Sequence, residues 1–380
     1  MAPETAAAAP AVDASKLKDI EKIFLAAFKN KASDVHIKAG LKPVLRVNTQ
    51  LHEIGNKVLT DEETHRMVNE ILSDDQAARF KVEHDLDFAY SIEGVGRFRV
   101  NIFYDRGTVA LAARRVNTDI PTFEQLNLPA TLKKCCDFGQ GIVMVAGATG
   151  SGKSTTLACM IESINKTQRS HIITIEDPIE YLFKDGQSFI NQREIGIDVP
   201  DFHQALKAVV RQDPDTILVG EMRDFISMEA ALMASETGHL VFATIHSSSA
   251  SSTIGRMLEL FPTERQPLIR QSLAFNLRAI ICQKLIPGAK EGIRTVPALE
   301  ILFNSPTATK LIMESEDKKL QELIRASEQE GMTDFNQSIF KLINAGLITK
   351  RAGLEYSPNA EQLKMNLKGI FLGDEKRILG

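Results

Sequence analysis

The sequence predicts an α/β protein of two domains, a smaller N-terminal α+β domain and a larger C-terminal α/β domain. Its 380 residues correspond to two to three domains of roughly 150 residues each. Up to about residue 116, apolar residues alternate with polar ones, which indicates half-buried strands of an antiparallel sheet. Further along, unbroken apolar runs separated by helical stretches are typical of parallel strands that are covered on both faces.

The N-terminal domain is predicted over residues 15–116. Apolar residues recur at three- and four-residue steps over 15–29, as one face of a helix requires. Thr60 and Glu63 have the spacing of a capping box that opens a second helix, and the Ser-x-x-Gln at 73–76 suits another. The segments DVHIKAG, PVLRVN, DLDFAYSI, RFRVNIFY and TVALAARRV are predicted as strands.

The remaining boundaries follow from changes in composition. Residues 1–14 are Ala-rich without a basic start or a strongly apolar stretch, so they predict a disordered tail and not a secretory signal. Residues 117–128 have the mixed polarity of a linker, with a proline inside and another just beyond. The α/β domain is expected over 129–310, and the helical spacing after it predicts a C-terminal helical extension over 311–380.

The α/β domain contains four continuous apolar runs, GIVMVAG, HIITIED, DTILVGE and HLVFATIH, each preceded or followed by a helical pattern. Runs of this kind predict adjacent parallel strands of one sheet. In such sheets, ligands bind outside the carboxyl ends of the strands. The residues that follow the runs are therefore the first candidates for a functional site.

Composition excludes several classes of protein. Lys and Arg number 45 against 49 Asp and Glu, a net charge of −4, and the chain has no Trp and four Tyr, so little favours a nucleic-acid partner. No apolar run approaches the roughly 18–20 residues of a transmembrane segment. The four cysteines form no CxxC pair, which argues against a zinc site or a disulfide framework and suits a reducing cytoplasm.

The first apolar run of the α/β domain leads into a complete G-x-x-x-x-G-K-S string, and a helical pattern follows it. This is the strand–loop–helix context of a phosphate-binding loop, or P-loop. Glycines allow backbone N–H groups to wrap a phosphate, the lysine reaches the β- and γ-phosphates, and the serine binds Mg²⁺. The predicted nucleotide-binding residues are Gly147, Ala148, Thr149, Gly150, Ser151, Gly152, Lys153, Ser154 and Thr155.

Acidic residues follow two further apolar runs. Glu221 ends ILVG, where a Mg²⁺-binding acid is expected, although Gly220 stands where an aspartate is common in P-loop proteins. Ser154 and Glu221 are therefore the predicted metal-binding residues, with Glu221 acting through water. Either Glu180 or Glu176 then remains to orient or deprotonate the attacking water.

Two histidines flank the last apolar run. His246 follows it, at the same strand-end position as the acidic residues, and His239 opens it. Both are candidates for sensing the γ-phosphate by hydrogen bonding, although His239 is equally well explained as a structural residue.

Taken together, GATGSGKSTT, ITIEDPIEY, RQDPDTILVGEMRD and TGHLVFATIH, with SDVHIKAG and GRFRVN upstream, resemble the secretion ATPase superfamily, and within it the type IV pilus twitching-motility ATPases of the PilT/PilU type. The resemblance implies a PAS-like N-terminal domain, a RecA-like ATPase domain and a homohexameric ring at the cytoplasmic side of the inner membrane. It further implies that Glu180 is the catalytic glutamate, Glu221 the Walker B acid, and His239 and His246 the His box.

The same resemblance implies that arginines of the N-terminal domain reach the phosphates. The candidates are Arg97, Arg99, Arg114 and Arg115, with Arg256 as a further candidate from a neighbouring subunit. Strand alternation places Arg97 and Arg99 opposite Phe98, away from the core of their own domain. An arginine supplied from another domain would make hydrolysis depend on domain geometry.

The resemblance favours pilus retraction, because the four-cysteine insertion usual in assembly and type II secretion ATPases is missing after Cys282. NSPTATKLI and EGMTDFNQ resemble the PilU-like branch, whereas GEMRD resembles PilT, so both paralogues stay open. The implied partners are ATP with Mg²⁺, further copies of the chain, a pilus platform protein of the inner membrane and a paralogous retraction ATPase. An assembly or secretion ATPase is the alternative, and a RecA-like nucleic-acid-dependent ATPase a distant one.

Overall fold

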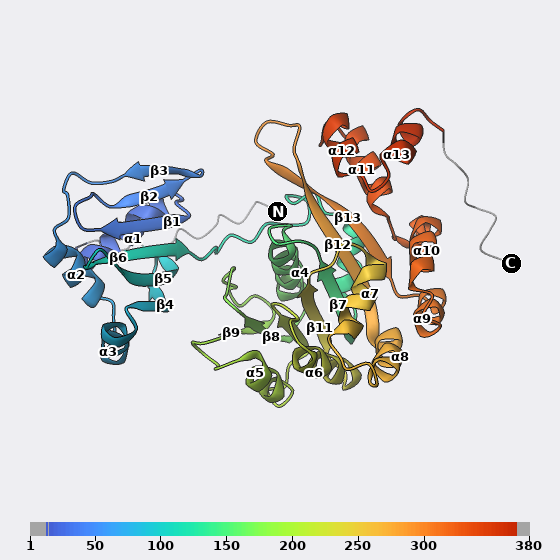
Figure 1. Ribbon diagram of the computed structural model, residues 1–380, viewed down its shortest axis with the longest axis horizontal. Coiled ribbons are helices and arrows are strands. Elements are labelled where there is room, and N and C mark those ends of the chain that lie inside the picture. The colour runs from blue at the N-terminus through green and yellow to red at the C-terminus, as the bar shows by residue number, and fades with distance from the viewer. Residues whose placement is uncertain (1–12, 14, 371–380) are drawn as a thin grey trace, which may run out of the picture. The chain divides into compact units, whose positions relative to one another are not determined.

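In the computed structural model, which describes residue 13 and residues 15–370, the chain divides into two compact units, Met1–Thr118 and Asp119–Gly380 (Figure 1). The tail predicted over 1–14 lies outside the described residues except for residue 13, and so do the last ten residues of the predicted C-terminal extension.

The first unit is an antiparallel sheet of six strands in the order β3-β2-β1-β6-β5-β4, with three helices. Its α+β character agrees with the prediction. The elements are α1 (Asp19–Lys29), β1 (Asp34–Lys38), β2 (Val44–Val47), β3 (Gln50–Glu53), α2 (Asp61–Asn69), α3 (Asp74–Glu83), β4 (Asp85–Ile92), β5 (Gly96–Asp105) and β6 (Thr108–Arg115).

One face of this sheet is packed against the helices. Phe98 and Val100 of β5 are at most 1% exposed, and the ring of Phe98 stacks on Phe24 of α1 with 4.5 Å between ring centroids. The capping box at Thr60 and Glu63 is present at the start of α2, as predicted. Helix α1 begins at residue 19 and not at 15, and β3, an edge strand of four exposed residues, lacks the alternation that would have predicted it.

The second unit contains a sheet of seven strands in the order β13-β12-β7-β11-β10-β8-β9, all parallel except β13. Its first half comprises η1 (Ala130–Cys136), β7 (Gly141–Ala146), α4 (Lys153–Thr167), β8 (His171–Glu176), β9 (Phe189–Glu194), α5 (Phe202–Val209), β10 (Thr216–Val219), α6 (Phe225–Glu236) and β11 (Leu240–Ile245). Its second half comprises α7 (Ala250–Glu259), α8 (Gln266–Asn276), β12 (Leu277–Pro287), β13 (Thr295–Phe303), α9 (Pro306–Met313), η2 (Asp317–Lys319), α10 (Leu320–Ala326), η3 (Glu328–Glu330), α11 (Phe335–Asn344), α12 (Lys350–Tyr356) and α13 (Ala360–Leu367).

Both faces of this sheet are buried, which confirms the interpretation of the unbroken apolar runs. All six residues of β7 are buried, and they alternate between two cores: Val143 and Val145 pack with α4 and η1, whereas Ile142 and Met144 pack with helices α5 to α8. The four predicted parallel strands are present as β7, β8, β10 and β11. Strands β9, β12 and β13 extend the sheet at its two edges beyond that prediction.

Two segments outside the central α/β region pack against the faces of the sheet: the predicted linker on one face and the helices after β13 on the other. Phe123 and Leu128, which lie within the predicted linker, are 4% and 7% exposed and pack against the same core as α4. On the other face, the helices after β13 bury Ile312, Phe335 and Ile339 in the core that contains Ile142. The C-terminal helices are therefore packed onto the seven-stranded sheet.

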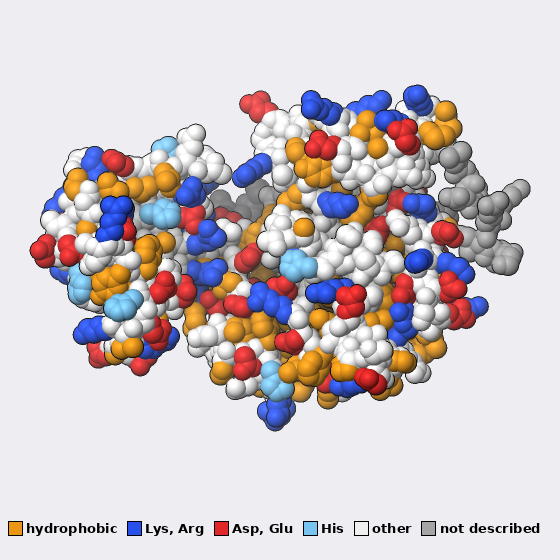
Figure 2. Space-filling view, in the orientation of Figure 1, with side chains coloured by type: hydrophobic (Ala, Val, Ile, Leu, Met, Phe, Trp, Pro, Cys, Tyr) orange, Lys and Arg blue, Asp and Glu red, His pale blue; other side chains and the backbone are white. Residues whose placement is uncertain are grey.

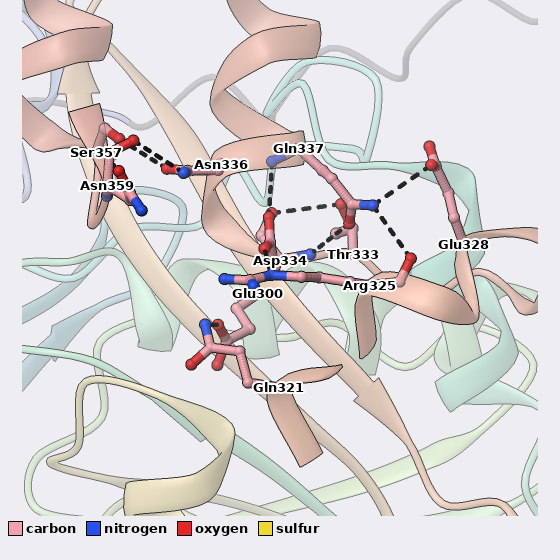
Figure 3. A network of polar contacts seen from close by, with 10 residues as sticks. All are labelled: Glu300, Gln321, Arg325, Glu328, Thr333, Asp334, Asn336, Gln337, Ser357 and Asn359. Atoms are coloured by element: carbon pink, nitrogen blue, oxygen red, sulfur yellow. Dashed lines mark hydrogen bonds and ion pairs between the residues drawn. The ribbon is translucent and has the colours of Figure 1, made fainter. Parts of the chain in front are cut away.

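A polar network joins these C-terminal helices to β13 (Figure 3). Asp334, with a side chain 4% exposed, caps α11 by accepting from the Gln337 N–H at 2.8 Å and pairs with Arg325 Nε at 2.7 Å. Glu300 of β13 is 2% exposed and accepts a hydrogen bond from the first N–H of α7 at Ala250. Burial raises the pKa of Glu300.

The lengths of the helices and the charges on the visible surface can be compared with the composition of the chain. Among the described residues, no helix combines the length and apolar character needed to cross a membrane. On the face seen in Figure 2, acidic and basic side chains are interspersed, in keeping with the net charge of −4.

Candidate nucleotide-binding site

The P-loop occupies the turn between β7 and α4, as predicted. Strand β7 ends at Ala146 and α4 begins at Lys153. Gly150 and Gly152 have φ angles of 76° and 86°, a left-handed backbone that glycine adopts without a steric penalty. Because the first N–H groups of a helix lack intrahelical partners, the start of α4 is suited to bind an anion.

Lys153 lies over this loop. Its Nζ donates to the carbonyl oxygens of Gly147 and Ala148 at 3.0 and 3.1 Å. Burial lowers the pKa of Lys153, and the nearby carboxylates of Glu221 and Glu180 partly oppose that effect. The ammonium group is thus held at the loop by weak neutral acceptors, from which a phosphate can attract it.

Four parallel strands end around a cavity of about 400 Å³ that includes the P-loop. The cavity lies at the carboxyl ends of the parallel strands β7, β8, β10 and β11, which is where open α/β sheets bind ligands. The lining residues are Thr149, Gly150, Lys153, Ser154, Leu157, Ala158, Glu176, Asp177, Pro178, Glu180, Tyr181, Phe183, Phe202, Leu218, Gly220, Glu221, Arg223, Thr244 and His246.

Glu221 and His246 connect the acidic side of the cavity to the P-loop. Glu221 Oε1 lies 2.8 Å from His246 Nε2, and His246 Nδ1 lies 3.2 Å from the carbonyl oxygen of Gly147. Both partners of the imidazole are acceptors, so only a ring with both nitrogens protonated donates to both at once. The other Glu221 oxygen accepts from Arg223 at 2.8 Å.

Glu176, the last residue of β8, and Glu180, four residues further on, differ in environment. Glu176 is 9% exposed and accepts hydrogen bonds from Thr174 Oγ1 at 2.6 Å and Gln192 Nε2 at 3.3 Å. Burial raises the pKa of Glu176 from 4.5 to about 7. Glu180, by contrast, is exposed and lines the cavity. Glu180 is therefore the more accessible of the two to a water molecule.

Several residues at or beside the cavity carried no predicted role, among them Tyr181, Gln192 and Arg223. Tyr181 brings its hydroxyl 3.0 Å from Thr155 Oγ1, and Gln192 of β9 donates to the Tyr181 carbonyl at 2.8 Å. Arg223 contacts Glu221 and lies 3.6 Å from Asp177. Tyr181 and Arg223 are each within two residues of a predicted acid, which was a usable signal, whereas Gln192 comes from a strand that the sequence pattern did not reveal.

The structure does not bring His239 or Arg256 to this cavity. His239 precedes β11 and His246 follows it, so the two histidines lie at opposite ends of this strand. His239 Nδ1 lies 2.8 Å from the carbonyl oxygen of Ala234. His239 therefore does not line the cavity of its own chain. Arg256 is in α7, where it pairs with Glu259 at 3.1 Å.

The predicted arginines of the first unit lie mainly on the sheet face that the helices leave uncovered. Arg99 of β5 and Arg114 of β6 are directly opposite in the register, and Arg114 Nε donates to Asp34 at 2.8 Å. Burial alone would raise the pKa of Asp34, but hydrogen bonds from Arg114 and Ser33 lower it overall. Arg97 shares the face of Arg99, as predicted.

Arg115 differs from the other arginine candidates. It is paired with the buried Phe98 in the register, on the helix-covered side of the sheet, and its guanidinium lies 5.8 Å from the ring centre of Phe28. Its contacts are those of a residue at the border of the core.

A P-loop between a parallel strand and a helix, facing acids at the ends of neighbouring strands, defines a P-loop ATPase of the RecA-like α/β class. Sequence comparison identifies the family. Residues 11–349 match the model of the Type II/IV secretion system protein family, and the chain belongs to this family.

Individual relatives agree over nearly their whole length. The type IV pilus ATPase PilU of Pseudomonas aeruginosa is 38% identical over 94% of this chain and 92% of its own. The type IV pilus retraction ATPase PilT of the same organism is 38% identical over 89% of this chain and 97% of its own. A crystal structure of the pilus retraction motor PilT with bound ADP is 40% identical, has a TM-score of 0.83 and covers 92% of this chain and 99% of that chain.

Proposed function

We propose that this protein is the subunit of a cytoplasmic motor that couples ATP hydrolysis to the retraction of type IV pili. The observation that carries the proposal is the gathering of the P-loop, two accessible carboxylates and His246 around one cavity. The similarity to PilT and PilU over nearly the full length of each supports retraction as the task.

In this proposal the P-loop binds the phosphates of ATP. The N–H groups of the loop and of the first turn of α4 contact phosphate oxygens, and Lys153 exchanges the carbonyls of Gly147 and Ala148 for the β- and γ-phosphates. Ser154 and Glu221 line the cavity with oxygen ligands that fit Mg²⁺. When bound there, Mg²⁺ would neutralise charge on the phosphate oxygens.

Hydrolysis requires a base and a source of positive charge. Glu180 is the proposed base, because its exposed carboxylate lines the cavity, whereas Glu176 is buried among hydrogen-bond donors. His246 is the proposed γ-phosphate sensor, since it already contacts both Glu221 and the P-loop. Arg97, Arg99 and Arg114 are proposed to stabilise the charge that develops on the γ-phosphate.

Because those arginines belong to a different unit from the P-loop, ATP binding and phosphate loss would change the relative position of the units. Such a change can be passed around a ring as mechanical work. We therefore propose a homohexamer at the cytoplasmic side of the inner membrane that acts on a pilus platform protein. A paralogous retraction ATPase is a further proposed partner.

The decisive experiment is deletion of the gene in its host, with complementation by the wild type and by Glu180→Gln. Retraction predicts hyperpiliated cells that do not twitch, rescued by the wild type and not by Glu180→Gln. Bald cells would instead identify an assembly ATPase. Stimulation of ATP hydrolysis by single-stranded DNA would favour the nucleic-acid-dependent alternative. The molar mass of the protein in solution with bound nucleotide tests whether it forms a hexamer.

A further inference from the structure

A glutamine of the strand beside the P-loop strand contacts the P-loop from within the core. Gln283 belongs to β12, which pairs in parallel with β7, and it is 3% exposed. Its Nε2 donates to the carbonyl oxygen of Ser151 at 2.7 Å, and its Oε1 accepts from Thr156 Oγ1 at 2.8 Å. Because the Ser151 carbonyl can only accept, this partner fixes which end of the amide is the nitrogen.

The same strand limits the space beneath the loop glycines. A Cβ at Gly152 would lie 2.7 Å from Gln283 Nε2, and one at Gly147 would lie 2.6 Å from the Gln283 carbonyl oxygen. The two outer glycines of the P-loop therefore rest directly on Gln283, through its side chain and its backbone.

The hydrogen bond to Ser151 has a consequence for the next N–H group. In a trans peptide unit, the C=O of one residue and the N–H of the next point in opposite directions. Since Gln283 holds the Ser151 C=O toward the core, the Gly152 N–H points away from it. The second bond, from Thr156, fixes the first turn of α4 on the same amide.

We propose that Gln283 is a positioning residue for nucleotide binding, which holds the peptide between Ser151 and Gly152 so that its N–H can bind phosphate. The inference rests on the proposed ATP-hydrolysing function. Gln283 also links the loop to β13, with which β12 pairs along its other edge. It acts through the P-loop backbone and does not touch the nucleotide itself.

The test measures ADP affinity and ATP turnover of the full chain carrying Gln283→Met, which keeps the volume and removes both hydrogen bonds. We expect about a tenfold rise in both the Kd for ADP and the KM for ATP, the equivalent of one hydrogen bond. The kcat should stay within about twofold, because this binding is shared by ground and transition states. Ser235→Ala is the control, since Ser235 is a buried hydroxyl that donates to Leu232 within α6.

A second variant, Gln283→Glu, adds a readout that a purely structural role would not give. An ionised carboxylate accepts from Thr156 but cannot donate to Ser151, whereas a protonated one can do both. The ratio of variant to wild-type Kd for ADP should therefore be large at pH 8 and shrink toward pH 5. If Gln283→Met fails to fold, this ratio and the Kd of Thr156→Val decide the question.

The proposal is wrong if Gln283→Met or its substitutes leave the Kd and KM within twofold of the wild type. It is also wrong if kcat falls while both constants are unchanged, or if Ser235→Ala weakens ADP binding equally. A wild type that binds ADP without hydrolysing ATP would overturn the proposed function instead, and the ADP affinities would still test the role of Gln283.

Discussion

The two sheets of this protein expose polar chemistry in different places. The six-stranded sheet has helices on one face, and its other face presents charged side chains along the strands, including Arg99 and Arg114. The seven-stranded sheet is covered on both faces, and β7 and β11 bury all six of their residues. Its accessible charges, such as Glu221, therefore lie at strand ends.

This difference determines where each unit can contribute to the proposed catalysis. A sheet covered on both faces is accessible to a ligand only at the ends of its strands, whereas a sheet covered on one face also offers the other face as a binding surface. In the proposed mechanism, the P-loop and the carboxylate that accepts a proton from water lie at the strand ends of one unit. The arginines that stabilise the phosphate charge lie on the open face of the sheet in the other unit. The following predictions test whether both contributions are needed.

The largest effect is expected from Arg97→Ala combined with Arg99→Ala. If the open face supplies the charge that stabilises the transferred phosphoryl group, kcat should fall by about 10³-fold, as for other arginines delivered from outside the P-loop domain. Steady-state phosphate release measures this, and ADP binding should persist. Arg79→Ala is the control, because Arg79 is an exposed arginine that pairs with Glu83 in the same unit. Unchanged turnover in the double variant would remove the open face from the mechanism.

Glu221→Gln tests the strand-end contribution. The amide keeps the size of the side chain but loses the charge that engages both Arg223 and His246, so we expect kcat to fall by about 10²-fold. Phosphate release is again the measurement. Glu229→Gln is the matched control, since Glu229 pairs with Arg265 away from the cavity. Equal activities in the two variants would contradict a role for Glu221.

The burial of Glu176 at the end of β8 can be tested through the pH dependence of the free energy of unfolding. Its folded-state pKa of about 7 lies above the ordinary value of 4.5, so the folded state binds the proton more tightly than the unfolded state. This stabilisation is present below pH 4.5 and is lost as the pH rises through 7. Relative to Glu176→Gln, the wild type should lose about 2 to 3 kcal/mol of unfolding free energy between pH 5 and pH 8.

The transition of the second unit in urea, followed at both pH values, measures that difference. A pH dependence that is identical in the wild type and in Glu176→Gln would show that Glu176 is not the buried acid that the structure indicates.

Much of this arrangement could be predicted from local pattern. The P-loop, the strand that precedes it and the helix that follows are specified by consecutive residues, and so are the capping boxes at Thr60 and Ser73. The four buried parallel strands were found because each is a continuous apolar run. In each case, the information lies within one continuous segment of the chain.

What could not be predicted depends on contacts between distant segments. Gln283 reaches the P-loop because β12 lies beside β7. Gln283 and its partner Ser151 are 132 residues apart in the sequence, and nothing in the segment around Gln283 indicates this contact. His239 and His246 flank one apolar run, and the strand that this run forms separates them and brings only His246 to the cavity.

The seven-stranded sheet also accommodates a buried carboxylate away from the nucleotide-binding cavity. Asp334 combines a cap on α11 with an ion pair to Arg325, next to β13 in the network of Figure 3. Asp334→Ala removes both, and we expect a loss of about 2 kcal/mol of unfolding free energy in the second unit. Asp334→Asn keeps a capping oxygen and should lose about half as much.

Asp201→Ala is the matched control, because Asp201 caps α5 in an exposed position and should cost about 1 kcal/mol. If Asp334→Ala cost no more than Asp201→Ala, the pair with Arg325 would add nothing beyond the cap. A larger cost would show that the ion pair with Arg325 stabilises the second unit beyond the effect of the cap.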